Sequence, residues 1–410
     1  MKYIIIIPDG MADLGIKKLG GKTPMEFAYT PVMDSLSASA EMGLVKTIPA
    51  GLPPGSDTAN LSVMGYDPLR YHTGRSPLEA VSLGIELKED DMVFRCNLVT
   101  LSNESGYREK RMIDYSAGEI SSEDSAILID YIKAGLETGN IKFYSGVSYR
   151  NIMVWNKGPG STRLTPPHDI LEKKIAQYLP GGDGSEVIMK LMEESGRMLP
   201  AHPLNRSRLD RGSRPANSIW LWGQGKKPYL DDFYDKYGLR GSVISAVDLI
   251  RGIGICAGLE TVKVEGITGT INTNLDGKAK AAVNEVLSGK DFVYVHIEAP
   301  DECSHQGSLG DKVKAIEMID EKIVGHIRAG MDKSKEEYRL MILPDHPTPI
   351  SLRTHTSEPV PFLIFDSREA KGSDMKKSSG FNEKTAASTG IMVGKGHMLV
   401  DRLFERRNPL

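Results

Sequence analysis

Residues Phe292–Asp301 read FVYVHIEAPD, an apolar run that ends in acidic residues. The run is continuous rather than alternating and is rich in β-branched and aromatic residues, which favours a strand buried on both faces. Three further runs share this form: Tyr3–Pro8 before Asp9, Arg339–Leu343 before Asp345-His346, and Pro361–Phe365 before Asp366. Together these runs predict a largely parallel sheet.

Helical patterns separate the runs. Residues Lys278–Leu287 and Asp311–Ile327 carry apolar side chains at i, i+3 and i+4 spacing. Alternating strands and helices predict an α/β fold in which the sheet lies between helices. Ligands of open α/β sheets bind at the carboxyl ends of strands, so we expect Asp9, Asp301 and Asp345 to meet at one edge.

The middle of the chain has a different pattern. Strand-like runs at Asn151–Trp155 and Ser218–Trp222 flank an amphipathic stretch at Ser185–Ser195, with Gly and Pro clusters between them. A chain of 410 residues is long enough for two domains. We therefore expect a core domain over residues 1–75 and 240–410, and an inserted α+β domain over residues 76–239.

Composition excludes several classes of protein. The 51 Lys and Arg residues against 54 Asp and Glu leave a net charge of −3, so no nucleic-acid partner is expected. No stretch approaches the roughly 20 apolar residues of a membrane span, and the N-terminal run is too short for a signal peptide. The scattered Cys96, Cys256 and Cys303 form no CxxC motif, which favours a reducing cytoplasm. The oligomeric state stays open.

Candidate metal ligands cluster at the predicted strand ends. Asp301 and His305 are four residues apart, so on a helix they share one face. An aspartate after a strand is, taken alone, more often a helix cap than a metal ligand. Here, however, the pair Asp301/His305 and the adjacent pair Asp345-His346 occur in one chain, both at predicted strand ends. Carboxylate and imidazole donors suit Mn²⁺, Zn²⁺, Co²⁺ or Fe²⁺ better than Ca²⁺. The candidates are Asp9, Asp301, His305, Asp345, His346 and His355.

A nucleophile candidate lies in residues 53–65, PPGSDTANLSVMG. Pro-Pro-Gly favours a turn, Ser56 or Asp57 suits the N-cap of a short helix, and Gly65 suits its C′ position. Backbone N–H groups at a helix N-terminus can hold a phosphoryl group. Serine is a weak nucleophile that needs a base or a metal ion, and as a simple alternative Ser56 only caps its helix.

Several motifs together resemble one known family, the archaeal-type, cofactor-independent phosphoglycerate mutases of the alkaline phosphatase superfamily. The similarity extends from residue 3 to about residue 405. The segments that carry it, in chain order, are MKYIIIIPDGMAD, LPPGSDTANLSVMGYDP, WLWGQGKKP, LRGSVISAVDLIRGIGICAGL, HIEAPDECSHQG and PDHPTPISLRTHTSEPVPF.

The resemblance implies an alkaline-phosphatase-like core with two divalent ions, usually Mn²⁺, with Zn²⁺, Co²⁺ or Mg²⁺ as alternatives. It implies that Ser56 becomes phosphorylated and that 2,3-bisphosphoglycerate is not required. Position by position, it assigns one ion to Asp9, Ser56, Asp345 and His346, and the other to Asp301, His305 and His355.

The implied reaction interconverts 3-phosphoglycerate and 2-phosphoglycerate, so the partner is a small phosphorylated substrate. Arginine suits its carboxylate and phosphate, and the candidates are Arg150, Arg214 and Arg240. His168-Asp169, similar to a segment of the family, is a candidate pair for acid–base work or for binding a hydroxyl.

The sequence departs from the family near the expected substrate site. Ser76 stands where the family usually has Gly, and the segment after His305 is longer. Two rivals on the same scaffold therefore remain, a homoserine kinase-like phosphotransferase and a phosphatase. No Walker or kinase Gly-rich motif occurs in the sequence. A metal-stabilised binding protein without activity is the rival from another class, and a ready nucleophile among the ligands argues against it.

Overall fold

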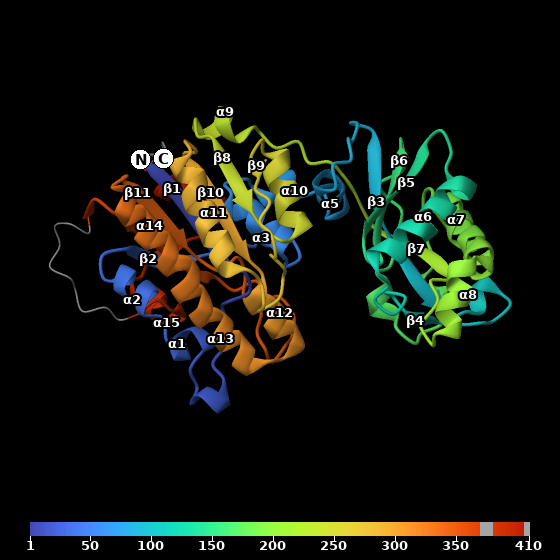
Figure 1. Cartoon of the computed structure of the whole chain (residues 1–410), viewed down its shortest axis with the longest axis horizontal. Helices are drawn as coiled ribbons and strands as arrows, with labels where there is room; N and C mark the ends of the chain where they lie inside the picture. Colours follow the sequence, from blue (N-terminus) through green and yellow to red (C-terminus); the bar gives the residue numbers. More distant parts are fainter. Residues whose placement is uncertain (370–379, 406–410) are drawn as a thin grey trace. The chain divides into compact units, whose positions relative to one another are not determined.

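The computed structural model describes residues 1–369 and 380–405. Within this part the chain divides into two compact units. We call the first the core unit, made of Met1–His72 and the chain from Tyr229 onward, and the second the inserted unit, Thr73–Pro228 (Figure 1). Of the expected core segment 240–410, residues 370–379 and 406–410 lie outside the described residues.

The core unit is built on an eight-stranded sheet in the order β13-β2-β12-β11-β1-β10-β8-β9. Only β12 runs against its two neighbours, and all other adjacent strands are parallel. This confirms the predicted α/β class with a largely parallel sheet. The strands are β1 (Lys2–Pro8), β2 (Glu41–Val45), β8 (Gly241–Ile244), β9 (Glu260–Thr261), β10 (Phe292–Ile297), β11 (Tyr338–Ile342), β12 (Val360–Asp366) and β13 (Met392–Val393).

Strand β1 lies in the middle of this sheet, between β10 and β11. Its four consecutive isoleucines, Ile4–Ile7, are fully buried, as a continuous apolar run predicts for a strand covered on both faces. Tyr3 pairs with Phe292 and Arg339 in parallel register. The segments that follow the three strands therefore leave the sheet at the same edge.

Helices cover the sheet, and in Figure 1 α11, α13 and α14 cross in front of it. The pattern over Asp311–Ile327 forms α13, a π-helical segment over Asp320–Gly325, and α14. The helices are α1 (Pro24–Phe27), α2 (Pro31–Ser37), α3 (Ser56–Val63), α4 (Pro68–Tyr71), α9 (Phe233–Tyr237), α10 (Asp248–Cys256), α11 (Leu275–Leu287), α12 (Ala299–Gln306), α13 (Leu309–Ile319), α14 (His326–Ser334), α15 (Glu383–Ser388) and α16 (Leu399–Leu403).

The inserted unit contains a separate, antiparallel five-stranded sheet. The predicted strands at Asn151–Trp155 and Ser218–Trp222 lie within β6 and β7, and the amphipathic stretch lies within α7. The elements are β3 (Asp91–Leu101), β4 (Met112–Asp114), β5 (Ile141–Val147), β6 (Arg150–Asn156), β7 (Ser218–Lys226), α5 (Ser76–Ser82), α6 (Ser122–Leu136), α7 (Ser185–Met198) and α8 (Pro203–Asp210).

Among the helices of the described residues, none combines the length and the apolar character that crossing a membrane requires.

Candidate active site

Asp9, Asp345 and His346 form one group of potential ligand atoms at the carboxyl edge of the core sheet. Asp9 directly follows β1, and the other two residues follow β11, the neighbouring strand. One ligand atom from each residue lies within 4.8 Å of the others, and all three side chains are buried. His346 Nε2 is 3.5 Å from Asp9 Oδ1 and 3.5 Å from Asp345 Oδ2.

Asp301, His305 and His355 meet beside this group. Asp301 and His305 lie one turn apart on α12, and Asp301 Oδ2 is 3.1 Å from His305 Nε2. His355 Nε2 lies 3.0 Å from His305 Nε2 and 3.5 Å from Asp301 Oδ1. His346 also falls within 4.8 Å of Asp301 and His355. The structure thus brings together all six predicted Asp and His residues, with His346 shared between the two groups.

The electrostatics of these residues suit cations. Burial, together with the carboxylates of Asp345 and Asp301, raises the pKa of Asp9 well above its ordinary value. Burial works to raise the pKa of Asp345, but His346, a hydrogen bond with Asp9 and His296 together lower that pKa below its ordinary value. A hydrogen bond with Asp301 raises the pKa of His305 to about 9. Without cations, the cluster must therefore retain protons to offset its buried carboxylates.

One buried carboxylate oxygen of the cluster lacks a hydrogen-bond partner within the part of the chain that the structure describes. Asp9 Oδ1 is buried and has no hydrogen-bond partner among the described residues. An orphaned buried carboxylate oxygen is costly unless another group satisfies it. Carboxylate oxygens converging with imidazole nitrogens make a donor set typical of Mn²⁺ and similar ions. The residues present therefore fit the ions that the sequence predicts.

Ser56 lies at the head of α3, against the first ligand group. Its Oγ is 3.1 Å from His346 Nε2. The N-cap is Gly55 rather than Ser56 or Asp57, so Ser56 is the first helical residue. Gly65 follows the helix with a φ of 87°, which agrees with its predicted C′ position. Ser56 thus lies at a helix N-terminus, a position that favours phosphoryl groups, and beside a candidate ion site.

Four residues of the site were missed by the sequence analysis. Gly10 approaches Asp301 so closely that a Cβ would lie 2.6 Å from Asp301 Oδ1. Thr348 donates to the same oxygen at 2.6 Å, and Asn60 donates to Asp345 Oδ2 at 2.8 Å. His296 Nε2 lies 3.0 Å from Asp9 Oδ2. Two signals were available: Asn60 is four residues after Ser56, and His296 interrupts an apolar strand.

The inserted unit holds the predicted residues Arg150, His168, Asp169 and Arg214. Arg150 is exposed at the start of β6 and lies over the ring of Tyr149, at 5.5 Å. His168 Nε2 is 3.7 Å from Asp169 Oδ1, and burial lowers the pKa of His168. Arg214 donates to Asp114 at 2.6 Å, so its guanidinium already has a carboxylate partner.

Arg240 belongs to the core unit and lies away from the Asp/His cluster. It directly precedes β8, and its carbonyl oxygen accepts from the N–H of Asp291, the residue before β10. Because β8 and β10 are parallel, Arg240 lies at the amino edge of the sheet, whereas Asp301 follows the carboxyl end of β10. A six-residue strand spans about 20 Å. Arg240, predicted as a substrate-binding arginine, therefore lies at the edge of the core sheet opposite to the Asp/His cluster.

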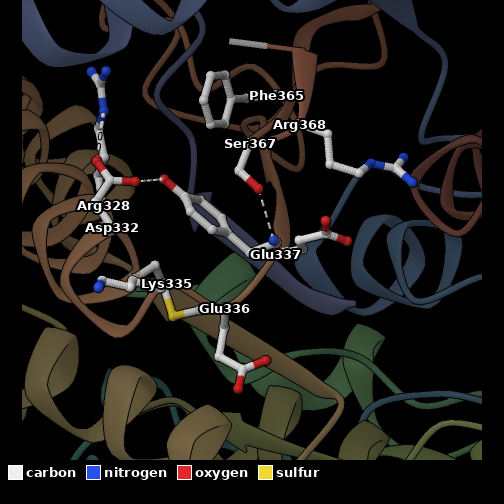
Figure 2. Close-up of a pocket in the computed structure, with 10 residues that line it drawn as sticks. Arg328, Asp332, Lys335, Glu336, Glu337, Phe365, Ser367 and Arg368 are labelled. Atoms are coloured by element: carbon white, nitrogen blue, oxygen red, sulfur yellow. Dashed lines mark hydrogen bonds and ion pairs between the residues drawn. The ribbon is translucent and has the colours of Figure 1, made fainter. Parts of the chain in front are cut away.

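A cavity of about 440 Å³ also opens at the amino edge of the core sheet (Figure 2). Tyr338, the first residue of β11, lines it and donates its hydroxyl to Asp332 at 2.8 Å. Ser367 accepts from the Tyr338 N–H at 3.0 Å. Since Asp345 and His346 follow the other end of β11, this cavity is separate from the candidate active site.

Comparisons with known proteins agree on one family. A family model described as 2,3-bisphosphoglycerate-independent phosphoglycerate mutase matches residues 37–205. A protein of Geobacter sulfurreducens, named as a probable 2,3-bisphosphoglycerate-independent phosphoglycerate mutase, is 49% identical over 406 residues, covering 99% of this chain and 100% of that protein.

Two solved structures are similar over nearly their whole length. A protein from Pyrococcus horikoshii has a TM-score of 0.82 and 30% identity, covering 100% of this chain and 98% of that chain. A cofactor-independent phosphoglycerate mutase from Thermoplasma acidophilum has a TM-score of 0.66 and 25% identity, covering 99% of each chain.

Proposed function

Since the chain belongs to the family of 2,3-bisphosphoglycerate-independent phosphoglycerate mutases, we propose that it interconverts 3-phosphoglycerate and 2-phosphoglycerate through a phosphoserine formed on Ser56. The observation that carries the proposal is the position of Ser56. Its Oγ lies 3.1 Å from His346 Nε2, beside clustered carboxylates and imidazoles and at the start of a helix. A serine that only capped its helix would not need carboxylates and imidazoles next to its hydroxyl group.

The proposed ligands are the six Asp and His residues together with Ser56. Asp9, Ser56, Asp345 and His346 would hold one ion, and Asp301, His305 and His355 the other. When bound, divalent ions supply positive charge that stabilises the deprotonated serine and the transferring phosphoryl group. Their identity, Mn²⁺ or a similar ion, is part of the proposal.

The chain's own residues then perform the transfer. Ser56 Oγ attacks phosphorus, the ester bond to the 3-oxygen of the substrate breaks, and that oxygen takes up the proton that Ser56 has lost. The retained glycerate turns so that its 2-hydroxyl attacks the phosphoserine. The bond from phosphorus to Ser56 Oγ breaks as the bond to the 2-oxygen forms, and Ser56 Oγ takes up the proton of the 2-hydroxyl, which gives 2-phosphoglycerate without any 2,3-bisphosphoglycerate as donor. Atoms and charge balance over the two steps.

Substrate recognition is assigned to the inserted unit. Arg150 is the favoured cation, because among the described residues no carboxylate pairs with its side chain, whereas Arg214 is held by Asp114. His168 and Asp169 are half-exposed and next to each other, which suits binding of a glycerate hydroxyl. Water must be kept from the phosphoserine, or the enzyme would act as a phosphatase.

The experiment that tests the proposal compares wild-type protein with Ser56→Ala. Both are loaded with Mn²⁺ and given 3-phosphoglycerate without 2,3-bisphosphoglycerate, and enolase reports 2-phosphoglycerate. We expect wild-type turnover and a loss of at least about 10³-fold in Ser56→Ala. Ser62→Ala is the matched control, since Ser62 is a buried serine of the same helix that donates to Thr47 O at 2.6 Å.

Two outcomes would reject the proposal. One is a folded, Mn²⁺-loaded wild-type protein without mutase turnover, and the other is an active Ser56→Ala variant. The same preparations are offered ATP with homoserine, and free phosphate is measured. Phosphorylated homoserine would identify the kinase-like rival, and phosphate release without 2-phosphoglycerate would identify a phosphatase.

A further inference from the structure

Asn60 lies one helical turn after Ser56 and is completely buried. Its Nδ2 donates two hydrogen bonds, one to Ser56 O at 2.8 Å and one to Asp345 Oδ2 at 2.8 Å. Its Oδ1 accepts from the hydroxyl of Tyr294 at 2.5 Å. A single side chain therefore joins the backbone of the nucleophile to a candidate ion ligand.

The chemistry of its partners fixes the orientation of the Asn60 amide. A backbone carbonyl and a carboxylate can only accept, so the NH₂ group must face Ser56 and Asp345. The amide oxygen then faces Tyr294, whose hydroxyl must donate. Tyr294 is itself fully buried in β10, next to β1. The direction of each hydrogen bond from Tyr294 to Asp345 is thus determined.

Asn60 also completes the support of Asp345. Asp345 Oδ1 accepts from the N–H groups of Gly10 at 3.2 Å and His346 at 2.9 Å. Asp345 Oδ2 accepts from Asn60 and lies 3.5 Å from His346 Nε2. Two backbone donors and one side chain hold the carboxylate in one orientation.

We propose that Asn60, supported by Tyr294, is a positioning residue that fixes Ser56 relative to Asp345 for phosphoryl transfer. The inference rests on the proposed function, because it takes Ser56 as nucleophile and Asp345 as ligand. Outer partners of metal ligands set ligand orientation, and their loss typically costs about 10–100-fold in metal affinity or activity. A small displacement of a nucleophile has a similar effect on the rate.

The test uses Asn60→Ala, Tyr294→Phe and the control Ser62→Ala in the full-length protein. Three quantities are measured: kcat and KM with 3-phosphoglycerate, the number and affinity of Mn²⁺ ions bound without substrate, and the melting temperature. Tyr294→Phe keeps the ring and removes only the hydroxyl that orients Asn60. Ser62→Ala removes a buried hydrogen bond of α3 that contacts neither Ser56 nor Asp345.

For Asn60→Ala we expect a 10–100-fold lower kcat, a KM within about threefold of wild type, and one of two Mn²⁺ ions bound 10–100-fold more weakly. The other ion keeps its affinity, because Asn60 does not contact Asp301, His305 or His355. Tyr294→Phe changes the same quantities by a smaller factor. Ser62→Ala lowers the melting temperature without changing kcat or ion affinity.

The inference is overturned if Asn60→Ala keeps wild-type kcat and binds both ions as the wild type does. It is also overturned if Ser62→Ala loses as much kcat and as much Mn²⁺ affinity as Asn60→Ala. If Asn60→Ala does not fold, Tyr294→Phe decides, and wild-type kcat and affinity in that variant overturn the inference. A wild-type protein without mutase turnover rejects the proposed function instead, and the Mn²⁺ affinities of the variants still decide the role of Asn60.

Discussion

Gly10 lies just after the carboxyl end of β1, at a position where a side chain has no room. Its φ is +63°, a left-handed conformation that favours glycine, and a Cβ would lie 2.6 Å from Asp301 Oδ1 and 2.6 Å from Thr348 Oγ1. These atoms belong to one of the candidate ligands and to the threonine that orients it. The backbone of Gly10 therefore passes close beside the second ligand group.

A Gly10→Ala substitution should damage both stability and ion binding. We expect the free energy of unfolding of the core unit to fall by about 3 kcal/mol, because strain and overlap add together. Gly20→Ala is the control, since Gly20 has a φ of +69° but open space where its Cβ would be. It should cost about 1 kcal/mol. Urea unfolding measures the stability of the two variants, and Mn²⁺ titration measures their ion affinity. If Gly10→Ala and Gly20→Ala lose stability and affinity equally, the close contacts around Gly10 do not cause the damage.

The sequence indicated the candidate ligands, but not the residues that hydrogen-bond to them. Asp9, Asp301 and Asp345 could be found because polar residues ending apolar runs must meet at one edge of a parallel sheet. Asn60 and Thr348 could not, because their partners are distant in sequence and only the folded register brings them together. Arg240 lies at the opposite edge because it precedes β8, a strand that was not predicted from the sequence.

Among the secondary-structure elements, α11 carries an unusual buried lysine. Lys278 is completely buried, donates to His296 O at 2.6 Å, and has a pKa that burial lowers to about 8. A lysine whose pKa is lower in the folded state than in the unfolded state costs stability at the pH values where it must be charged. The pattern of α11 predicted its helical form, but not that a lysine would face the sheet.

The stability of the core unit should therefore rise with pH between about 8 and 10.5, by about 3 kcal/mol at most. Below pH 8 the buried ammonium must stay charged, and above 10.5 it is neutral in both states. Lys278→Met should remove this part of the pH dependence. Lys280→Met, on the exposed face of α11, is the control and should keep it. Urea unfolding at pH 7, 8.5 and 10 measures the free energy of unfolding of both variants. The prediction is refuted if this free energy depends on pH in the same way in Lys278→Met and Lys280→Met.

Element boundaries show where local patterns stop being sufficient. The apolar spacing over Asp311–Ile327 predicts one helix, but the structure inserts a π-helical segment at Asp320–Gly325. Asp320 accepts there from the N–H groups of Val32 and Met33, at 3.1 and 2.7 Å, and so caps the start of α2. A contact between segments almost 300 residues apart has no signal in the local sequence.

At the scale of the whole molecule, the inserted unit has its own hydrophobic core and its own sheet. Its two ends lie side by side, since Thr73 Oγ1 donates to Lys226 O at 2.6 Å. Gly225 lacks a side chain where Thr73 O approaches, and a Cβ there would lie 2.2 Å away. A unit closed in this way has what an independently folding domain requires.

Residues 73–228, expressed alone, should fold and unfold in one cooperative thermal transition. A fragment cut at the boundaries expected from the sequence, 76–239, is the comparison. It lacks Thr73 and carries Phe233, which in the core unit stacks on Phe292 at 4.7 Å. We expect this second fragment to aggregate on heating. Circular dichroism and light scattering distinguish the two, and an unfolded 73–228 fragment would contradict the prediction.

The candidate ligands come from distant parts of the chain, with Asp9 directly after the first strand and His355 in the last quarter. During synthesis on the ribosome, a growing chain has no complete ligand cluster until residue 355 has emerged. Ser56 is made early, but the His346 beside it arrives about 290 residues later. A truncated or stalled chain therefore carries Ser56 without the imidazole that the complete fold places 3.1 Å from its Oγ.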